Sequence, residues 1–216
     1  MSGIDPNIWG PSAWRLLHDI SFYVAMANTE ETLRQGKEFF MLLRHVLPCS
    51  KCQMSYDRHL LALPYPKQSK DVPRWVFELH HRVSDDVKGR HVEAPIWQEW
   101  HISYPATISH HTLRGAWPFI QSIAETYPIG SMYNKKVYIH SMERFFVLLW
   151  GFLRGMDGFR YQQDVARIED LITLPRTKRV LPSARLFKTW ITMIGRRVYA
   201  HDADAAKCNK GCMAPQ

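Results

Sequence analysis

Four cysteines occur in the 216 residues, and they stand in two pairs. Cys49 and Cys52 follow Pro48 in the stretch LPCSKC, and Cys208 and Cys212 lie near the C-terminal end. A C-x-x-C pair at the start of a helix can form an exchangeable disulfide, because the positive end of the helix favours a thiolate. The same spacing is typical of half a zinc site, which would need two further ligands such as Cys208 and Cys212. The pair alone therefore leaves redox chemistry and metal binding open.

A helical bundle is the predicted scaffold for this first cysteine pair. Apolar residues recur at helical intervals through residues 12–90, with Ser12 as the expected N-cap of the first helix, and no strand-like alternation of useful length occurs. Prolines, caps and a closing glycine divide this part of the chain into helices over residues 13–27, 29–47, 49–63 and 71–89. Four helices with short connections indicate an all-α bundle.

The chain changes character after Gly89. Residues 91–115 are rich in His, Trp and Pro and predict a linker or an irregular wrap, with a solvated turn at residues 109–111. Further helices are expected over residues 116–128, 135–156, 162–172 and 183–207. We therefore predict a first domain over residues 1–92, a second helical domain over residues 93–205 and a flexible tail with the C-x-x-x-C pair over residues 206–216.

Composition limits the class of protein. The longest apolar stretch, residues 145–153, is shorter than the roughly 18 residues that a membrane span needs. The first residues lack the basic start and apolar run of a signal peptide, so a soluble cytoplasmic protein is expected. The net charge of +8 is compatible with nucleic-acid binding. However, lysines and arginines are scattered, and aromatic residues do not interleave with their densest cluster at residues 174–188, so no nucleic-acid partner is expected.

The neighbours of the cysteine pair carry a more specific pattern. From Trp9 to Val87 the order is W-G-P-x-x-W-x-x-x-H-x-x-x-x-Y, a helix ending in L-P-C, C-x-x-C, and then H-x-x-V-x-x-x-V. This order resembles the FAD-linked sulfhydryl oxidases of the Erv/ALR family, including versions encoded by large DNA viruses. In that family a four-helix bundle holds FAD beside the C-x-x-C disulfide. The resemblance covers about residues 7–90, and it implies an FAD-dependent thiol oxidase, expected from a virus and acting in the host cytoplasm or the virion.

The resemblance assigns roles to the matching residues. Cys49 and Cys52 correspond to the catalytic disulfide, with Cys52 next to the flavin and Cys49 attacked by the incoming thiolate. His81 and Ser84 stand where the family has asparagines, and Gly89 stands where it often has lysine, so individual polar contacts are expected to differ. No metal ligand is implied. The implied FAD contacts are Trp9, Gly10, Trp14, His18, Tyr23, Cys52, His80, His81, Val83, Ser84, Val87 and Lys88.

The resemblance also implies a reaction and its partners. Electrons would pass from dithiols of client proteins through the Cys49–Cys52 disulfide to FAD and on to O2, giving H2O2. Lys88 and Arg90 would meet the phosphates, and either Trp97 or Trp100 would stack on the adenine. Cys208 and Cys212 are predicted to act as a shuttle disulfide, with a structural clip as the alternative, and a homodimer is expected. The alternative function is a zinc-stabilised basic interaction or nucleic-acid-binding protein that uses the four cysteines as ligands.

Overall fold

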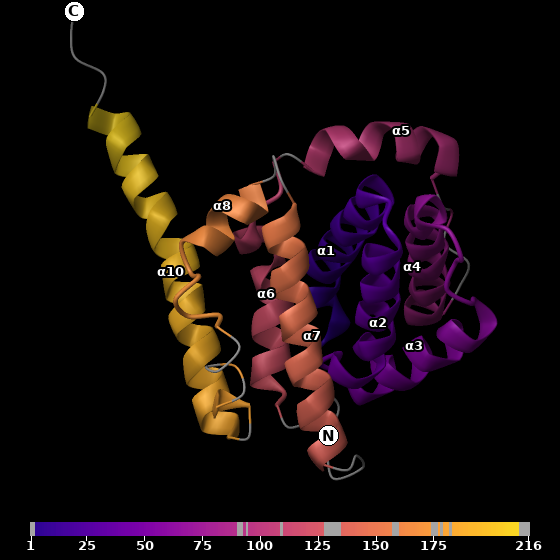
Figure 1. The fold of residues 1–216 in the computed structure, drawn as a ribbon, viewed down its shortest axis with the longest axis horizontal. Helices are drawn as coiled ribbons and strands as arrows, with labels where there is room; N and C mark the ends of the chain where they lie inside the picture. Colours follow the sequence, from indigo (N-terminus) through magenta and orange to yellow (C-terminus); the bar gives the residue numbers. More distant parts are fainter. Residues whose placement is uncertain are drawn as a thin grey trace, which may run out of the picture.

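Helices make up all the regular structure that the computed structural model describes (Figure 1). The described residues are 3–89, 93, 95–108, 110–127, 135–156, 160–173, 177, 179–181 and 183–211, of which residues 135 and 201–211 are described by their backbone alone. The prediction of an all-α fold is confirmed. The first part of the chain forms α1 (Pro6–Ala27), α2 (Glu30–Val46), α3 (Ser50–Ala62), the short 3-10 helix η1 (Ser69–Asp71) and α4 (Val72–Lys88).

Local capping sets the ends of these helices. The Asp5 carboxylate accepts a hydrogen bond from the backbone N–H of Asn7 at 2.9 Å, so α1 begins at Pro6. The prediction that Ser12 caps this helix was wrong: Ser12 lies inside α1 and its hydroxyl donates to the carbonyl of Trp9 at 2.7 Å. The W-G-P break resembled a helix start, but a proline near the N-terminal end of a helix removes few backbone hydrogen bonds.

Thr29 and Gly89 act as the sequence predicts. Thr29 and Thr32 cap the start of α2 reciprocally, each side chain accepting from the other residue's backbone N–H. Gly89 closes α4 with a φ of 61°, a left-handed conformation that favours glycine. Asp71 is the N-cap residue of α4, although its side chain makes no capping hydrogen bond.

A second group of helices follows: α5 (Trp97–Ile108), α6 (Leu113–Glu125), α7 (Lys135–Gly155), α8 (Arg160–Ala166) and α10 (Ala184–Gly211). The predicted irregular wrap over residues 91–115 was wrong, because α5 and the start of α6 occupy much of it. Exposed Ile102 and the internal Pro105 obscure the helical period of α5. Its position depends on tertiary contacts, since Tyr104 stacks on Phe22 of α1 with ring centroids 5.4 Å apart.

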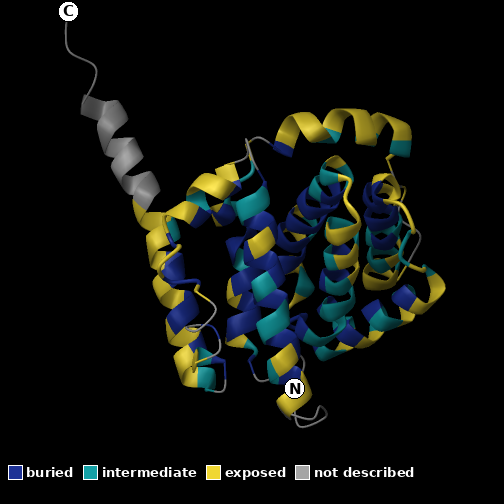
Figure 2. Cartoon of the chain, viewed as in Figure 1, coloured by how far each residue is buried: buried dark blue, intermediate teal, exposed yellow. Residues whose placement is uncertain are grey.

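One hydrophobic core joins the two groups of helices. In Figure 1, α6 and α7 stand beside α1 and α2, and the buried residues in Figure 2 continue from one group to the other. Phe39 of α2 stacks on Phe145 of α7 at 5.1 Å, and Trp9 of α1 lies 5.7 Å from Phe119 of α6. This core crosses residue 92, where the boundary between two domains is predicted, and the division itself stays a prediction.

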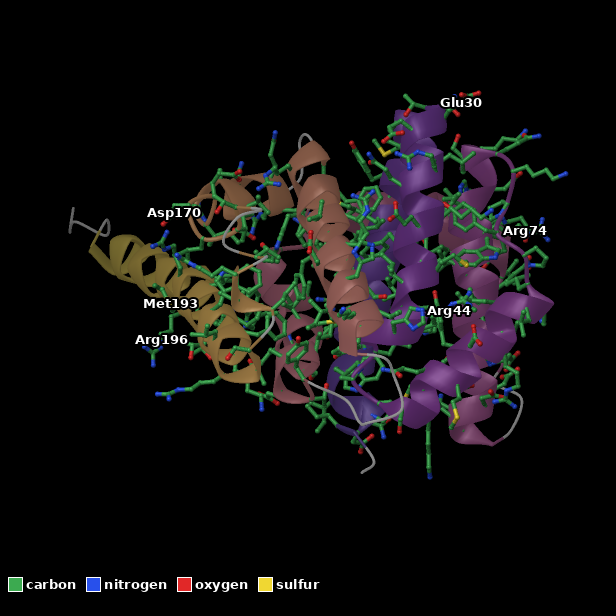
Figure 3. All side chains as sticks on the ribbon, turned by 60° about the horizontal axis from the view of Figure 1, so that its bottom comes forward. Glu30, Arg44, Arg74, Asp170, Met193 and Arg196 are labelled. Atoms are coloured by element: carbon green, nitrogen blue, oxygen red, sulfur yellow. A yellow bond between two sulfur atoms is a disulfide. The ribbon has the colours of Figure 1, made fainter. Side chains whose placement is uncertain are left out.

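The outermost helix is α10, which packs on α6 away from α1–α4 (Figure 1). Its inner face is anchored by Trp190, whose indole N–H donates to the carbonyl of Leu171 at 2.6 Å. Met193 and Arg196 are exposed on its outer side (Figure 3). The predicted shuttle pair lies outside the described side chains, because Cys208 is described by backbone alone and Cys212 not at all. Within the described part of the chain, no helix is long and apolar enough to cross a bilayer.

Candidate functional site

Cys49 and Cys52 form a disulfide at the start of α3, with their Cα atoms 5.1 Å apart. Cys49 is the N-cap residue, and its Sγ accepts a hydrogen bond from the backbone N–H of Cys52 at 3.2 Å. The free N–H groups of a helix start favour negative charge, so a Cys49 thiolate would be stabilised there after reduction. Cys49 is only 8% exposed, and the N–H of Ile4 donates to the carbonyl of Pro48 at 3.2 Å directly beside it.

A pocket of about 600 Å³ opens beside this disulfide. Such a volume falls within the range of cofactor and small-molecule sites. Cys52 is part of its lining, whereas Cys49 does not line it. The predicted cofactor contacts that line the pocket are Trp9, Gly10, Trp14, His18, Cys52, His80, His81, Val83, Ser84, Val87 and Lys88. The structure therefore brings together residues of α1, α3 and α4 that lie far apart in the sequence.

Planar side-chain rings form much of the pocket wall. Trp14 of α1 stacks on His80 of α4, with ring centroids 4.2 Å apart and an interplanar angle of 12°. His18 Nε2 and His80 Nδ1 are hydrogen-bonded at 3.1 Å. The Trp100 ring lies 4.7 Å from the ring of His18. Trp14 and His18 share a face because they are four residues apart on α1, and aromatic faces of this kind hold planar ligands by stacking.

Both histidines are held neutral by their surroundings. Burial, followed by the nearby charges of His80 and His81, holds the pKa of His18 well below its ordinary value. Burial, followed by the charge of His81, lowers the pKa of His80 to about 4. His18 Nδ1 is buried and has no hydrogen-bond partner among the described groups. Because a buried polar atom without a partner costs free energy, the pocket suits a planar ligand with polar groups at its edge.

Two cations stand at the pocket, Arg15 of α1 and Lys88 at the end of α4. Long basic side chains can bind phosphate oxygens, so the pocket has a place for the anionic part of a dinucleotide. Arg90, the other predicted phosphate contact, lies outside the described residues.

Tyr23, a predicted cofactor contact, lies away from this pocket. Tyr23 does not line the pocket; its ring lies edge-on to Phe152 of α7 at 6.1 Å, and its hydroxyl occupies the space next to Gly155. Tyr23 follows His18 by five residues, which rotates it by roughly 140° around the helix axis. It therefore faces the second group of helices.

Of the two tryptophans predicted to stack on an adenine, the structure places Trp100 in the pocket wall. Trp97 does not line the pocket, and its ring packs edge-on against Phe77 at 5.2 Å. The two residues lie three positions apart on α5, so the choice between them depends on how this helix is set on α1 and α4.

Three residues of the site carry no clear signal in the sequence. Tyr104 and His111 line the pocket, and both bind the buried carboxylate of Asp19. The predicted solvated turn at residues 109–111 was wrong for His111, whose side chain is 15% exposed. Asp19 follows the predicted His18, but its spacing from Arg15 is typical of an exposed ion pair on a helix. The one available signal was an acidic residue within a helix whose neighbours are mostly apolar.

The zinc-site alternative is not favoured. Cys49 and Cys52 are bonded to each other. Across the described ranges no group of three or more His, Cys, Asp or Glu side chains is arranged to hold a metal ion.

Fold and site together define a helical domain that presents a C-x-x-C disulfide to an aromatic pocket of cofactor size. Residues 11–105 match the model of the Erv1/Alr family. This part of the chain is therefore an Erv1/Alr family domain, and the resemblance inferred from the motif order is confirmed.

Curated relatives support the same assignment. A probable FAD-linked sulfhydryl oxidase of Acanthamoeba polyphaga mimivirus is 28% identical over 85 residues, which cover 38% of this chain and 59% of the relative. The mitochondrial FAD-linked sulfhydryl oxidase of Saccharomyces cerevisiae is 22% identical over 91 residues, covering 42% and 48%. A putative FAD-linked sulfhydryl oxidase of Invertebrate iridescent virus 6 is 35% identical over 52 residues, covering 24% and 47%.

The chain spans about half the length of the curated relatives it matches. No solved structure matches it significantly.

Proposed function

We propose that this protein is an FAD-dependent thiol oxidase that forms disulfide bonds in client proteins. The observation that carries the proposal is the Cys49–Cys52 disulfide at a pocket of about 600 Å³, with Cys52 in the pocket lining. The names of the curated relatives, all FAD-linked sulfhydryl oxidases, support the same activity.

Cys49 and Cys52 have different roles in the thiol chemistry. A client thiolate attacks Sγ of Cys49, which forms a mixed disulfide and releases Cys52 as a thiolate. The second client thiol then attacks the mixed disulfide, so the client leaves oxidised and Cys49 is freed as a thiol. The positive end of α3 stabilises thiolate at both positions, and Cys52 faces the pocket, where the electron pair leaves the dithiol. Two client thiols and one O2 thereby become one disulfide and one H2O2.

The residues of the pocket fit FAD. When bound, FAD accepts two electrons from the dithiol and supplies the transfer to O2. Trp14, His18 and His80 would hold the planar rings, and the unpartnered Nδ1 of His18 would gain a hydrogen bond. Trp100 would stack on the adenine, and Lys88 would meet the phosphates. The remaining predicted contacts on α4 are His81, Val83, Ser84 and Val87.

Two further parts of the proposal concern partners. Cys208 and Cys212 would pass electrons from client thiols to the Cys49–Cys52 pair as a shuttle disulfide. The homodimer implied by the family resemblance stays a prediction. Within one chain, α6 and α7 already lie against α1 and α2.

The test uses the full-length protein. It is expected to purify yellow with about one FAD per chain, and to consume O2 and release H2O2 when dithiothreitol is supplied. Cys208→Ser with Cys212→Ser should retain this activity with dithiothreitol and lose it with a reduced protein client. A colourless protein that does not bind added FAD would refute the proposal.

A further inference from the structure

Asp19 on α1 has a side-chain exposure of 0% and is hydrogen-bonded to two residues of the pocket wall, Tyr104 and His111. Three later segments of the chain donate hydrogen bonds to it. The hydroxyl of Tyr104 on α5 lies 2.8 Å from Oδ1, and the hydroxyl of Tyr161 on α8 lies 2.8 Å from Oδ2. Nδ1 of His111, between α5 and α6, lies 2.9 Å from Oδ2.

These three donors make burial of the carboxylate tolerable. An isolated buried carboxylate is strongly unfavourable, whereas hydrogen bonds to a charged acceptor are short and strong. Burial, followed by the charge of Asp19 and the hydrogen bond to it, raises the pKa of both Tyr104 and Tyr161. Both hydroxyls therefore keep their protons and donate to Asp19 at physiological pH.

The three donors differ in their relation to the pocket. Tyr104 and His111 line it, whereas Tyr161 is completely buried and does not. Nδ1 of His111 is bound to Asp19, so the orientation of the imidazole in the pocket wall is set by that bond. The carbonyl oxygen of Arg15 lies 3.2 Å from the Tyr104 hydroxyl and shares its proton with Asp19.

This cluster stands at the end of the pocket that is farther from the disulfide. The backbone N–H of Ile4, just before α1, donates a hydrogen bond to the carbonyl of Pro48, which is next to Cys49. The indole N–H of Trp9 donates to the carbonyl of the same Ile4. Asp19 lies ten residues beyond Trp9, about 15 Å along the helix axis. In Figure 1, α3 crosses one end of the bundle and α5 crosses the other.

We propose that Asp19 is a positioning residue that holds Tyr104 and His111 in the pocket wall, so that these two side chains help to bind the adenylate half of the cofactor. This inference rests on the proposed FAD-dependent function, because it places the flavin half beside Cys52. Tyr104 and His111 are thereby part of the cofactor site, and Tyr161 supports them through Asp19.

The test measures binding of FAD, FMN and ADP to the full-length apoprotein by flavin fluorescence and by competition. FMN lacks the adenylate half, and ADP lacks the flavin. Asp19→Asn leaves an amide N–H facing three donors, and the loss of one well-placed hydrogen bond corresponds to about a tenfold change in affinity. We expect the Kd for FAD and ADP to rise about tenfold and that for FMN to change less than about twofold.

Tyr161→Phe is the second variant. Its hydroxyl lies outside the pocket, so an effect on FAD binding has to act through Asp19, and we expect the Kd for FAD to rise by a few fold. Tyr127→Phe is the matched control: it removes a buried hydroxyl that donates to the carbonyl of Leu181, in a part of the core away from the pocket. This control should bind FAD as the wild type does.

Each outcome decides the matter. Unchanged FAD affinity in both Asp19→Asn and Tyr161→Phe would overturn the positioning role, as would equal weakening for FMN and ADP, which indicates a general loosening of the pocket. Weakening by Tyr127→Phe as large as that by Tyr161→Phe would also overturn it. A wild-type protein that binds no FAD would refute the proposed function itself, whereas a wild type that binds FAD alongside unaffected variants would refute the positioning role alone.

Discussion

Cys49 and Cys52 differ in their surroundings although they belong to the same turn of α3. Cys52 lines the pocket, and Cys49 caps the helix and is 8% exposed. If the cofactor occupies this pocket, a thiolate at position 52 lies against the flavin. Cys49→Ser should therefore show a broad long-wavelength absorption band from contact between a thiolate and the oxidised flavin, and Cys52→Ser should show none. The measurement is the visible spectrum of each purified variant at pH 8.

Activity and spectrum together separate the two roles. Both variants should lose at least about 100-fold in O2 consumption with dithiothreitol, because either change removes the disulfide. Identical spectra for the two variants would contradict the assignment of Cys52 as the pocket-facing thiol.

His18 and His80 predict a pH dependence of stability in the apoprotein. A histidine whose pKa is lowered by folding binds its proton less readily in the folded state, so the unfolded chain takes up more protons as the pH falls below about 6.5. For His80, the free energy of unfolding should thus decrease from about pH 6.5 down to about pH 4, by up to about 1.4 kcal/mol per pH unit, and His18 contributes in the same direction. Urea unfolding at pH 7 and pH 5 measures this decrease.

Substitutions isolate the contribution of one histidine. His80→Asn should lose less stability between pH 7 and pH 5 than the wild type, by about 1–2 kcal/mol. His110→Asn changes an exposed histidine and should keep the wild-type pH dependence. A His80→Asn variant with the same dependence as the wild type would show that burial of this imidazole does not govern acid stability.

At the scale of elements, close packing decides where α10 lies. A Cβ atom at Gly195 would come within 2.7 Å of Nε1 of Trp117 on α6 and 2.9 Å of its Cε2. Gly195→Ala should therefore force α10 away from α6 and lower the free energy of unfolding by about 1–3 kcal/mol. Denaturant unfolding monitored by tryptophan fluorescence measures the stability of the variant.

Gly151→Ala on α7 is the control for this prediction. Nothing lies within 4 Å of a Cβ at Gly151, so alanine should be neutral or stabilise the helix by up to about 1 kcal/mol. Equal stability of the two variants would mean that α10 is free to shift on α6.

At the scale of the whole molecule, the second group of helices completes the core of the first. Phe39 packs against Phe145 and Phe152 of α7, and Arg144 of α7 forms a salt bridge to Glu38 of α2. Each large apolar side chain that loses its cover costs roughly 1.5–3 kcal/mol, against a total stability of about 5–15 kcal/mol for a typical domain. A chain truncated after residue 92 should therefore fail to unfold cooperatively, as measured by near-ultraviolet circular dichroism during heating.

Truncation after residue 206 provides the comparison. This variant keeps the helices that cover α1 and α2 and should unfold cooperatively like the full chain. Cooperative unfolding of a monomeric fragment of residues 1–92 would instead support the predicted division into two domains.

Local sequence signals were enough to predict the helices of the first part of the chain and several residues of the site. Apolar spacing predicted the helices of residues 12–90, except that α1 begins at Pro6 and not after Ser12. The four-residue interval between Trp14 and His18 is a local property that puts both on one face of α1. The family resemblance predicted that Cys52 and most of the α4 residues that line the pocket belong to the site. Residues 97–108 were missed as a helix, because the contacts that set α5 in place involve side chains on α1 and α4.

The order of residues by itself determined a helical chain with a C-x-x-C pair at the start of a helix, because helical periodicity, caps and cysteine spacing are local properties. Only the tertiary structure decided that Trp100 and not Trp97 meets the pocket, and that Tyr23 faces α7. It also decided that Asp19 binds His111, 92 residues away. These contacts join segments that are distant in the chain, and packing of a common core selects them where no local periodicity does.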